Sequence, residues 1–310
     1  MKAIRLHEPV GHEPVGIEGL VYEEAPDPTP VFGDVVVKVH ACGITPTELD
    51  WPIWTDRAGH RRDTIIPAQE FSGVVAALGF GTAGVAVGDE VYGLIMAYWD
   101  GAAAEYIAIE ARDVAPKPTT VDHVHAAAIP QAGLTSWQAL FEHGRLAAGQ
   151  TVVIHGAGGA VGTAAVQLAR SVGAHVVGTG RSNVRSRVLE LGADRFVDLE
   201  QDRWEDAVGQ VDVVYDIIGG DVLARSLALV KPGGALVTVM GPPPATRQDI
   251  RTVFFIRQPN RAQLVELARL VDAGQLRPPQ IGAVYPLAEA RNAFTAQANH
   301  DVAGKVILRP

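Results

Sequence analysis

The clearest chemical pattern in the chain is a glycine-rich segment, His155-Gly156-Ala157-Gly158-Gly159-Ala160-Val161-Gly162. It follows an apolar strand pattern over 151–155 and precedes a helical pattern over 161–171. Glycine lets the backbone turn sharply and approach a pyrophosphate, and the helix N-terminus then offers free N–H groups and a positive dipole end. In this strand–helix context the segment predicts a dinucleotide-binding turn that uses Gly156, Gly158, Gly159, Ala160 and Val161.

The glycine spacing is a variant of the common one. G-x-G-x-x-G fails when read from Gly156, because Val161 takes the place of the third glycine, whereas A-x-G-x-x-G is met by Ala157, Gly159 and Gly162. The alternative is a glycine-rich turn that binds nothing. His155, at the end of the strand, is expected to be a hydrogen-bonded structural residue.

The end of the second strand indicates which dinucleotide would bind. An NAD enzyme usually carries Asp or Glu there, to hold the ribose 2′-hydroxyl. The segment from Thr179 to Arg185 contains no acid, and Arg181, Ser182 and Arg185 are suited to a 2′-phosphate. We therefore predict NADPH as the cofactor, with Thr179 beside it. The alternative is that these arginines are ordinary solvated surface residues.

The elements that must position these residues change character along the chain. The first 115 or so residues contain short strand patterns at 35–40, 71–76, 88–93 and 103–109 and a long polar loop over 52–63. From Thr151 onward, strand patterns at 151–155, 174–179, 212–216 and 235–239 alternate with helical patterns at 161–171 and 222–230, with a tight turn at 231–234. Such alternation predicts a parallel sheet with right-handed crossovers.

The remaining elements lie near the end of the sequence. A helix is expected over 261–272, with Asn260 as its N-cap and Gly274 as its stop, followed by a helix near 287–298 and a strand over 305–309.

Composition excludes several classes of protein. The chain has 310 residues, or about two domains. Its single cysteine, Cys42, rules out an intramolecular disulfide and a four-cysteine zinc site. The net charge of −9 argues against nucleic acid as a partner. We found no signal peptide and no apolar run long enough to span a membrane, and therefore expect a cytoplasmic protein without membrane contact.

Several segments in combination resemble the medium-chain dehydrogenase/reductase superfamily, and within it the zinc-independent quinone oxidoreductase-like branch. They are the segments 88–93, 104–106, 133–140, 155–162, 229–234, 287–290 and 304–308. The resemblance covers essentially the whole chain. It implies an α/β protein with a GroES-like β-rich domain at 1–118, completed by 275–310, and a Rossmann domain with a doubly wound parallel sheet at 119–274. It also implies an oligomer, for which we predict a homodimer.

The resemblance allows the zinc question to be asked residue by residue. Zinc enzymes of this superfamily place ligands at positions that match Thr45, Gln69 and approximately Gln131. None of these side chains is a good ligand for Zn²⁺, which prefers thiolate, imidazole or carboxylate. Glu70 is retained next to Gln69, but one carboxylate does not hold a metal. We therefore expect no metal.

The resemblance also suggests residues on the substrate side. Thr45 is placed to donate a hydrogen bond to a substrate oxygen, and Gln69 to face the site. Asp50 falls where the branch often has a tyrosine, so the match fails there. Trp51 and Trp54 form either an aromatic wall or packing for their loop. Glu48 is expected to be structural, capping the backbone of its own turn.

Further cofactor contacts are expected at the carboxyl ends of the parallel strands, where ligands bind in such sheets. Thr135 matches a position near the nicotinamide. Phe254 and Phe255 match a stretch that meets the carboxamide, although they suit a dimer core equally well. The strand-end residues expected to line the cofactor are Ile217, Gly219, Met240 and Gly241.

These expectations favour an NADPH-dependent, zinc-independent oxidoreductase that transfers hydride to a quinone or an activated alkene (enone), with a small molecule as substrate. Such acceptors are already electrophilic, so orientation by the protein does most of the work. Two alternatives stay open. One is a reductase of the same fold acting on a dedicated biosynthetic ketone or enoyl substrate, and the other is a protein that binds NADPH without turnover.

Overall fold

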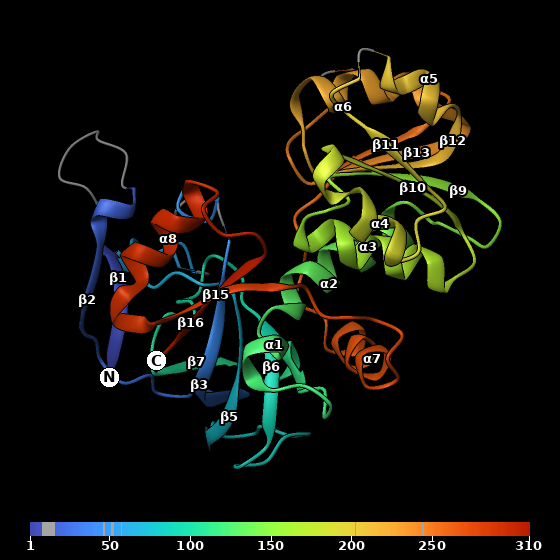
Figure 1. Cartoon of the computed structure of the whole chain (residues 1–310). Helices are drawn as coiled ribbons and strands as arrows, with labels where there is room; N and C mark the ends of the chain where they lie inside the picture. Colours follow the sequence, from blue (N-terminus) through green and yellow to red (C-terminus); the bar gives the residue numbers. More distant parts are fainter. Residues whose placement is uncertain (8–15, 46, 51–52, 57, 202, 244) are drawn as a thin grey trace. The chain divides into compact units, whose positions relative to one another are not determined.

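The computed structural model describes residues 1–7, 16–45, 47–50, 53–56, 58–201, 203–243 and 245–310 (Figure 1). The chain divides into two compact units. Unit 1 comprises Met1–Gln131, Gln258–Ala273 and Pro278–Pro310, and unit 2 comprises Ala132–Arg257 and Gly274–Arg277.

Unit 2 is built on a six-stranded parallel sheet with the strand order β11-β10-β9-β12-β13-β14. In chain order this is 3-2-1-4-5-6, the order of a doubly wound dinucleotide-binding sheet, so the predicted Rossmann fold is confirmed. Figure 1 shows the sheet between α3 and α4 on one face and α5 and α6 on the other. Its strands are β9 (Thr151–His155), β10 (His175–Gly180), β11 (Arg195–Asp198), β12 (Val211–Asp216), β13 (Val230–Thr238) and β14 (Arg251–Phe254).

The helices of unit 2 are short, and both faces of the sheet are apolar. Strand β9 is buried from Val152 to its end, as expected for a strand covered on both sides. Strand β14 is the edge strand, and Phe254 on it is 37% exposed. The helices are α3 (Ala160–Ser171), α4 (Arg185–Glu190), α5 (Trp204–Val208) and α6 (Gly220–Ser226).

Unit 1 is β-rich, as the short strand patterns predict. A seven-stranded sheet has the path β15-β16-β3-β5-β6-β8 with β7 also paired to β3, and a small sheet has the order β2-β1-β4. Strand β16, from the end of the chain, pairs with β3 so that Leu308 lies opposite Cys42. The strands are β1 (Lys2–His7), β2 (Leu20–Glu24), β3 (Asp34–Ile44), β4 (Thr64–Ile65), β5 (Glu70–Leu78), β6 (Glu90–Leu94), β7 (Tyr106–Glu110), β8 (Val114–Pro116), β15 (Ile281–Pro286) and β16 (Lys305–Arg309).

The longer helices of unit 1 include α7 (Arg261–Asp272) and α8 (Ala290–Ala298), and its short helix α1 (His123–Ala126) precedes α2 (Ile129–Trp137). The boundary between the two units falls within α2. Sequence analysis put this boundary at 118/119 and assigned residues through 274 to the Rossmann domain. The contacts instead group α1 and α7 with unit 1. The Asp272 carboxylate accepts hydrogen bonds from the Thr119 and Thr120 amides, and the Arg261 guanidinium reaches the Ala111 carbonyl at 3.2 Å.

Two expected elements differ from the structure. The helix expected over 222–230 ends at Ser226, because β13 begins at Val230. The turn expected at 231–234 lies inside β13, where the pairing with β12 shifts register between Val211 and Val213. By contrast, α7 is capped as predicted, with the Asn260 side chain accepting a hydrogen bond from the Gln263 amide.

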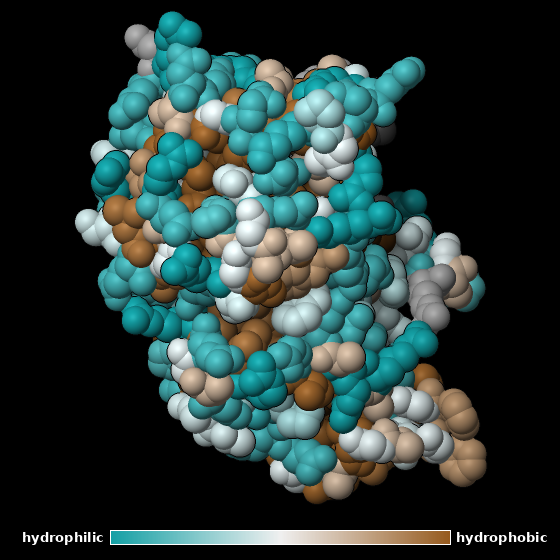
Figure 2. All heavy atoms as spheres, turned by 90° about the vertical axis from the view of Figure 1, so that its right-hand side faces the viewer, coloured by the Kyte–Doolittle hydropathy of each residue, from teal (hydrophilic) through white to brown (hydrophobic). Residues whose placement is uncertain are grey.

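The surface and the helices bear on whether the chain could contact a membrane. The face shown in Figure 2 is mostly hydrophilic, with smaller hydrophobic patches. Among the described residues, no helix has both the length and the apolar character that a membrane crossing requires.

A buried histidine joins the elements beneath the glycine turn. His155 at the end of β9 is fully buried, with Nδ1 2.8 Å from Thr179 Oγ1 and Nε2 2.9 Å from Ser226 Oγ. The Trp204 ring packs edge-on against it at 5.2 Å. Burial lowers the pKa of His155 to about 3, because the charged ring would lose its hydration. His155 is the hydrogen-bonded structural residue that the sequence suggested.

The lowered pKa of His155 predicts how the stability of the fold changes at acidic pH. Because the folded pKa lies below the ordinary value, His155 stabilises the fold above about pH 6.5, and that stability is lost as the pH falls towards 3. Its share of the loss between pH 7 and pH 5 is about 2 kcal/mol. We expect His155→Gln to be less stable than wild type at pH 7, with the gap narrowing by about that amount at pH 5 in urea unfolding. The control is His175→Gln, at an exposed position, and a constant gap for His155→Gln would contradict the interpretation.

Candidate functional site

The glycine turn lies at the carboxyl end of β9, in the middle of the parallel sheet. Gly156 has a φ of +81°, which an L side chain rarely adopts. The Ala157 amide donates to the Thr179 carbonyl at 2.9 Å, and the Gly159 amide donates to the Gly156 carbonyl at 3.1 Å. These bonds fix the turn to the neighbouring strand β10.

Close packing behind the turn requires glycine at a second position. A Cβ on Gly162 would lie 2.1 Å from the Gly156 carbonyl oxygen, so only glycine lets α3 approach β9 this closely. Gly159 differs, because the single atom near its hypothetical Cβ is the Gly156 carbonyl oxygen at 3.6 Å, and Gly159 itself is exposed.

The N-terminus of α3 can receive an anion. Gly159 is its N-cap and provides no side-chain hydrogen bond, so the first helical amides are not capped by that residue. Ala160 and Val161 form the start of the helix and are half-buried. The helix dipole and these amides suit a phosphate group. The turn therefore fits the pyrophosphate of a dinucleotide.

The residues predicted for the 2′-phosphate have different surroundings. Thr179 is fully buried, and its hydroxyl is held by His155, so its side chain supports the turn. Arg185 lies over the Phe196 ring, 5.8 Å from its centroid. Ser182, which is exposed, opens the short 3₁₀ turn after β10. The Arg181 side chain is 82% exposed and approaches Glu200 at 3.7 Å.

Glu200 is a residue that sequence reasoning missed. No acid follows β10 in the sequence, but Glu200 follows the next strand, β11, and the fold brings it beside Arg181. Only the parallel pairing of β10 with β11 could have indicated this.

The residues that follow β12 and β13 lie close to the glycine turn and to each other. Ile217 and Ile218 lie next to Gly156, at 3.6 and 3.4 Å from the position of a Cβ built on that glycine. Gly219 lies next to Met240, since a Cβ built on Gly219 would be 3.0 Å from Met240 Cβ. Asp216, which was also missed, accepts hydrogen bonds from the Gly219 amide at 3.0 Å and the Thr238 hydroxyl at 3.0 Å. It thereby ties the ends of β12 and β13 together.

The remaining cofactor candidates divide into buried and exposed positions. Thr135 is buried, and Phe255 is buried with its ring 4.5 Å from that of His143. Gly241 is half-buried, whereas Met240 and Phe254 are 45% and 37% exposed.

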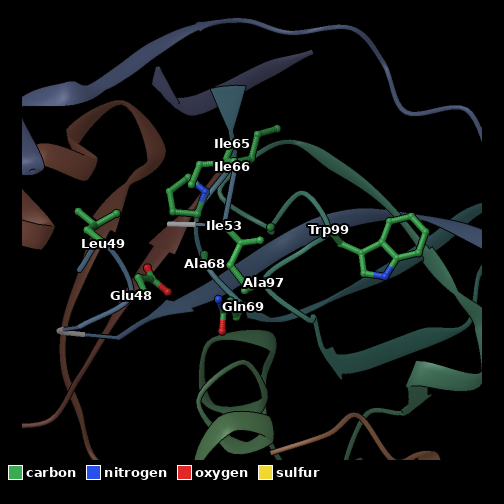
Figure 3. A pocket seen from close by; sticks show the side chains of 11 residues that line it. Glu48, Leu49, Ile53, Ile65, Ile66, Ala68, Gln69, Ala97 and Trp99 are labelled. Carbon is green, nitrogen blue, oxygen red and sulfur yellow. The ribbon is translucent and has the colours of Figure 1, made fainter. Parts of the chain in front are cut away.

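A pocket in unit 1 is the candidate substrate site (Figure 3). Its walls are mainly aliphatic, with the side chains of Glu48 and Gln69 as the polar groups among them. The lining residues are Glu48, Leu49, Ile53, Ile65, Ile66, Pro67, Ala68, Gln69, Ala97, Trp99 and Gly101. The lining has the character of a site for an apolar molecule with one polar end, but its volume of about 20 Å³ is that of about one water molecule, so the pocket must widen to admit a substrate.

Of the predicted substrate residues that the structure describes, Gln69 lines this pocket, and Thr45, Asp50 and Trp54 do not. Thr45 is half-buried, and its carbonyl accepts from the Glu48 amide at 3.2 Å. Asp50 is exposed, and Trp54 packs against the apolar core of unit 1. Trp51 lies outside the described residues. The pocket's aromatic wall is Trp99, which sequence analysis did not identify.

Beside the pocket lies a buried ion pair. Glu70, which is 1% exposed, contacts the Lys305 ammonium and accepts a hydrogen bond from the Gln131 amide at 2.9 Å. Glycine at position 43 makes room for this carboxylate, since a Cβ there would lie 2.5 Å from Glu70 Oε1. Glu70 is therefore held as part of the wall behind the pocket.

Glu48 is buried without such support. Both of its carboxyl oxygens are inaccessible to solvent, and neither has a hydrogen-bond partner of normal geometry among the described residues. Burial raises the pKa of Glu48 to about 8; the Glu70 charge adds to this rise, while Lys305 and the nearby Thr45 and Ala68 amides oppose it.

The positions that match zinc ligands carry Thr45, Gln69 and Gln131. In the described ranges, no three His, Cys, Asp or Glu side chains are grouped so that they could hold a metal ion. Cys42 is a free, buried thiol whose pKa is raised by burial.

Two family models match the chain. The one described as an alcohol dehydrogenase GroES-like domain matches residues 32–119, and the one described as a zinc-binding dehydrogenase matches residues 191–308.

Curated and solved relatives match over nearly the whole chain. A quinone oxidoreductase from Sus scrofa is 30% identical, covering 99% of this chain and 97% of its own. A 2-methylene-furan-3-one reductase from Solanum lycopersicum is 30% identical, covering 89% and 71%. The structure of the quinone oxidoreductase from Coxiella burnetii superposes with a TM-score of 0.86 at 27% identity, covering 100% and 99%. With its GroES-like unit, its Rossmann sheet and these relatives, the chain belongs to the medium-chain dehydrogenase/reductase superfamily of oxidoreductases.

Proposed function

We propose that the protein is an NADPH-dependent, zinc-independent oxidoreductase that transfers hydride to a quinone or an activated alkene. The observation that carries this proposal is the exposed glycine turn at the start of α3, where the N-cap Gly159 leaves the first helical amides without a side-chain partner. When bound, the nicotinamide cofactor supplies the hydride.

The residues of unit 2 divide the work of holding this cofactor. The amides at the start of α3 bind the pyrophosphate, and Gly159 leaves room for it. Arg181 and Ser182, both exposed after β10, receive the 2′-phosphate. Glu200 holds Arg181 in position when that phosphate is absent.

The acceptor class is supported by the pocket and by the relatives. An apolar lining with Gln69 and Glu48 as polar groups suits a conjugated carbonyl compound. Two relatives, a quinone oxidoreductase and a 2-methylene-furan-3-one reductase, are named for acceptors of this class.

Zinc independence rests on the chemistry of the side chains. Thr45, Gln69 and Gln131 provide no thiolate, imidazole or carboxylate at the positions that match ligands. The homodimer and the cytoplasmic location stay predictions; the edge strand β14 offers unpaired backbone groups through which a second copy can pair.

The function is tested by anaerobic oxidation of NADPH and NADH against a panel of quinones, enones and aldehydes, with and without a chelator. We expect oxidation of NADPH with quinones or enones, no effect of the chelator, and less than about 0.1 zinc per chain by metal analysis. Stoichiometric zinc that the chelator removes together with activity would refute zinc independence. Tight NADPH binding without turnover of any acceptor would favour a dedicated metabolite or a binding protein.

The 2′-phosphate role is tested with Arg181→Ala. Removing a charged donor from a phosphate should weaken NADPH binding by about 10- to 100-fold and leave NADH binding within about threefold. The matched control is Arg203→Ala, since both side chains are equally exposed (82% and 81%) and each faces an acid. Isothermal titration with both dinucleotides distinguishes the cases, and equal weakening of both would remove the role.

The glycine turn is tested with two alanine variants. Gly162→Ala should destabilise the protein by about 1–3 kcal/mol, because its Cβ meets the Gly156 carbonyl. Gly159→Ala has space for its Cβ and should keep the wild-type stability, yet weaken NADPH binding at least about tenfold, because a methyl group then faces the pyrophosphate. Urea unfolding and titration measure the two effects, and unchanged NADPH binding by Gly159→Ala would contradict the assignment.

A further inference from the structure

A buried lysine, Lys305, is paired with the buried carboxylate of Glu70. Lys305 on β16 contacts Glu70 and donates to the Ile44 carbonyl at 3.2 Å. Glu70 on β5 also receives the Gln131 amide. The third acidic group facing this cluster is the Cys42 thiol on β3, which burial keeps neutral by raising its pKa. The ion pair between Lys305 and Glu70 is thus complete without Glu48.

Burial, together with the pairing of Lys305 to Glu70, favours the protonated state of Glu48. With one ammonium already paired to Glu70, an ionised Glu48 would be a second buried carboxylate with no counter-charge of its own. Burying an unpaired charge is unfavourable, and a carboxyl group avoids it by keeping its proton. The raised pKa of Glu48, about 8, agrees with this geometry.

Glu48 belongs to the pocket wall, and its two carboxyl oxygens, which are covered in this structure, become reachable only when the pocket opens. It lines the pocket together with Gln69, and Figure 3 shows both side chains at the same part of the pocket wall. A structural role as a cap of its own turn would need its oxygens to accept well-aligned backbone hydrogen bonds, and in the described part of the chain they do not.

We propose that Glu48 carries a proton at neutral pH and donates it to the substrate oxygen that becomes negative during reduction. This inference rests on the proposed reductase function. It makes Glu48 the acid of the reaction and Glu70 a positioning residue, because the nearby Glu70 carboxylate disfavours a second negative charge on Glu48.

The proton and the electrons balance as follows. Hydride from NADPH bonds to the electrophilic carbon of an enone, and the electron pair of the conjugated system moves to the carbonyl oxygen. The O–H bond of Glu48 breaks as an O–H bond forms at that oxygen. NADP⁺, an enol and the Glu48 carboxylate result, and water then reprotonates Glu48 while the enol rearranges to the ketone.

The ionisation of Glu48 is tested on the protein alone, without cofactor or substrate. A group whose folded pKa is raised stabilises the fold below its ordinary pKa, and that stability is lost as the pH rises towards about 8. The Tm of Glu48→Gln should therefore rise relative to wild type by about 3 °C or more between pH 6 and pH 9. Glu289→Gln, at an exposed position of unit 1, should show no such change. A Tm difference that does not depend on pH would overturn the proposal.

The donor role is tested with NADPH and an enone. Glu48→Gln should lower kcat about 100-fold at pH 7 with KM within about twofold, and Glu48→Asp should restore part of the loss. Wild-type kcat should fall above about pH 8, and this limb should be missing in Glu48→Gln. A variant that keeps wild-type kcat would refute the donor role.

The two proposals fail in different ways. If wild type turns over no acceptor, the reductase function falls and the donor role with it, whatever the melting curves show. If wild type turns over enones and Glu48→Gln does so equally well, the donor role alone falls.

Discussion

The close approach of α3 to β9 is the constraint on which unit 2 depends. A Cβ at position 162 would collide with the Gly156 carbonyl. Because this residue is glycine, the helix can begin directly at the end of the central strand. Its first amides then point into the space beside Gly159. The buried hydrogen bonds of His155 and Asp216 hold the neighbouring strand ends around this turn. The close packing of the α3 backbone against the turn at Gly156 therefore sets the geometry of the candidate binding turn.

Two buried polar side chains, one in each unit, differ in whether their hydrogen-bonding groups have partners. His155 is neutral and has a hydroxyl partner at each ring nitrogen, so it is satisfied and rigid. Glu48 is buried without hydrogen-bond partners of normal geometry among the described residues. A satisfied buried group specifies a structure, whereas an unsatisfied one costs free energy and is retained most readily where it serves a reaction. The contrast separates a structural residue from a chemical one without reference to sequence motifs.

Much of the fold could be predicted from the sequence, because its signals are local. The glycine turn, the alternation of strands and helices in unit 2, and the Asn260 cap each depend on residues within one or two turns of each other. The doubly wound parallel sheet was expected from the resemblance, and the relatives bear that resemblance out.

The rest depends on contacts between distant segments, which no local pattern reports. Glu200 approaches Arg181 only because β10 and β11 pair in parallel. Trp99 reaches the pocket from a loop after β6, while the aromatic candidates near position 51 drew attention to a different segment. The electrostatic surroundings of Glu48 include Lys305, which lies at the opposite end of the sequence.

The position of Lys305 has a consequence for the order in which the protein is made on the ribosome. Strand β16, which carries this lysine, pairs with β3 only after unit 2 has been synthesised. Until then, Glu70 lies in a nascent chain without its counter-charge, and the sheet that carries it lacks two strands, β15 and β16. Unit 2, nearly continuous in sequence, can fold first. Synthesis from the N-terminus to the C-terminus thus favours folding of unit 2 before the sheet of unit 1 is complete.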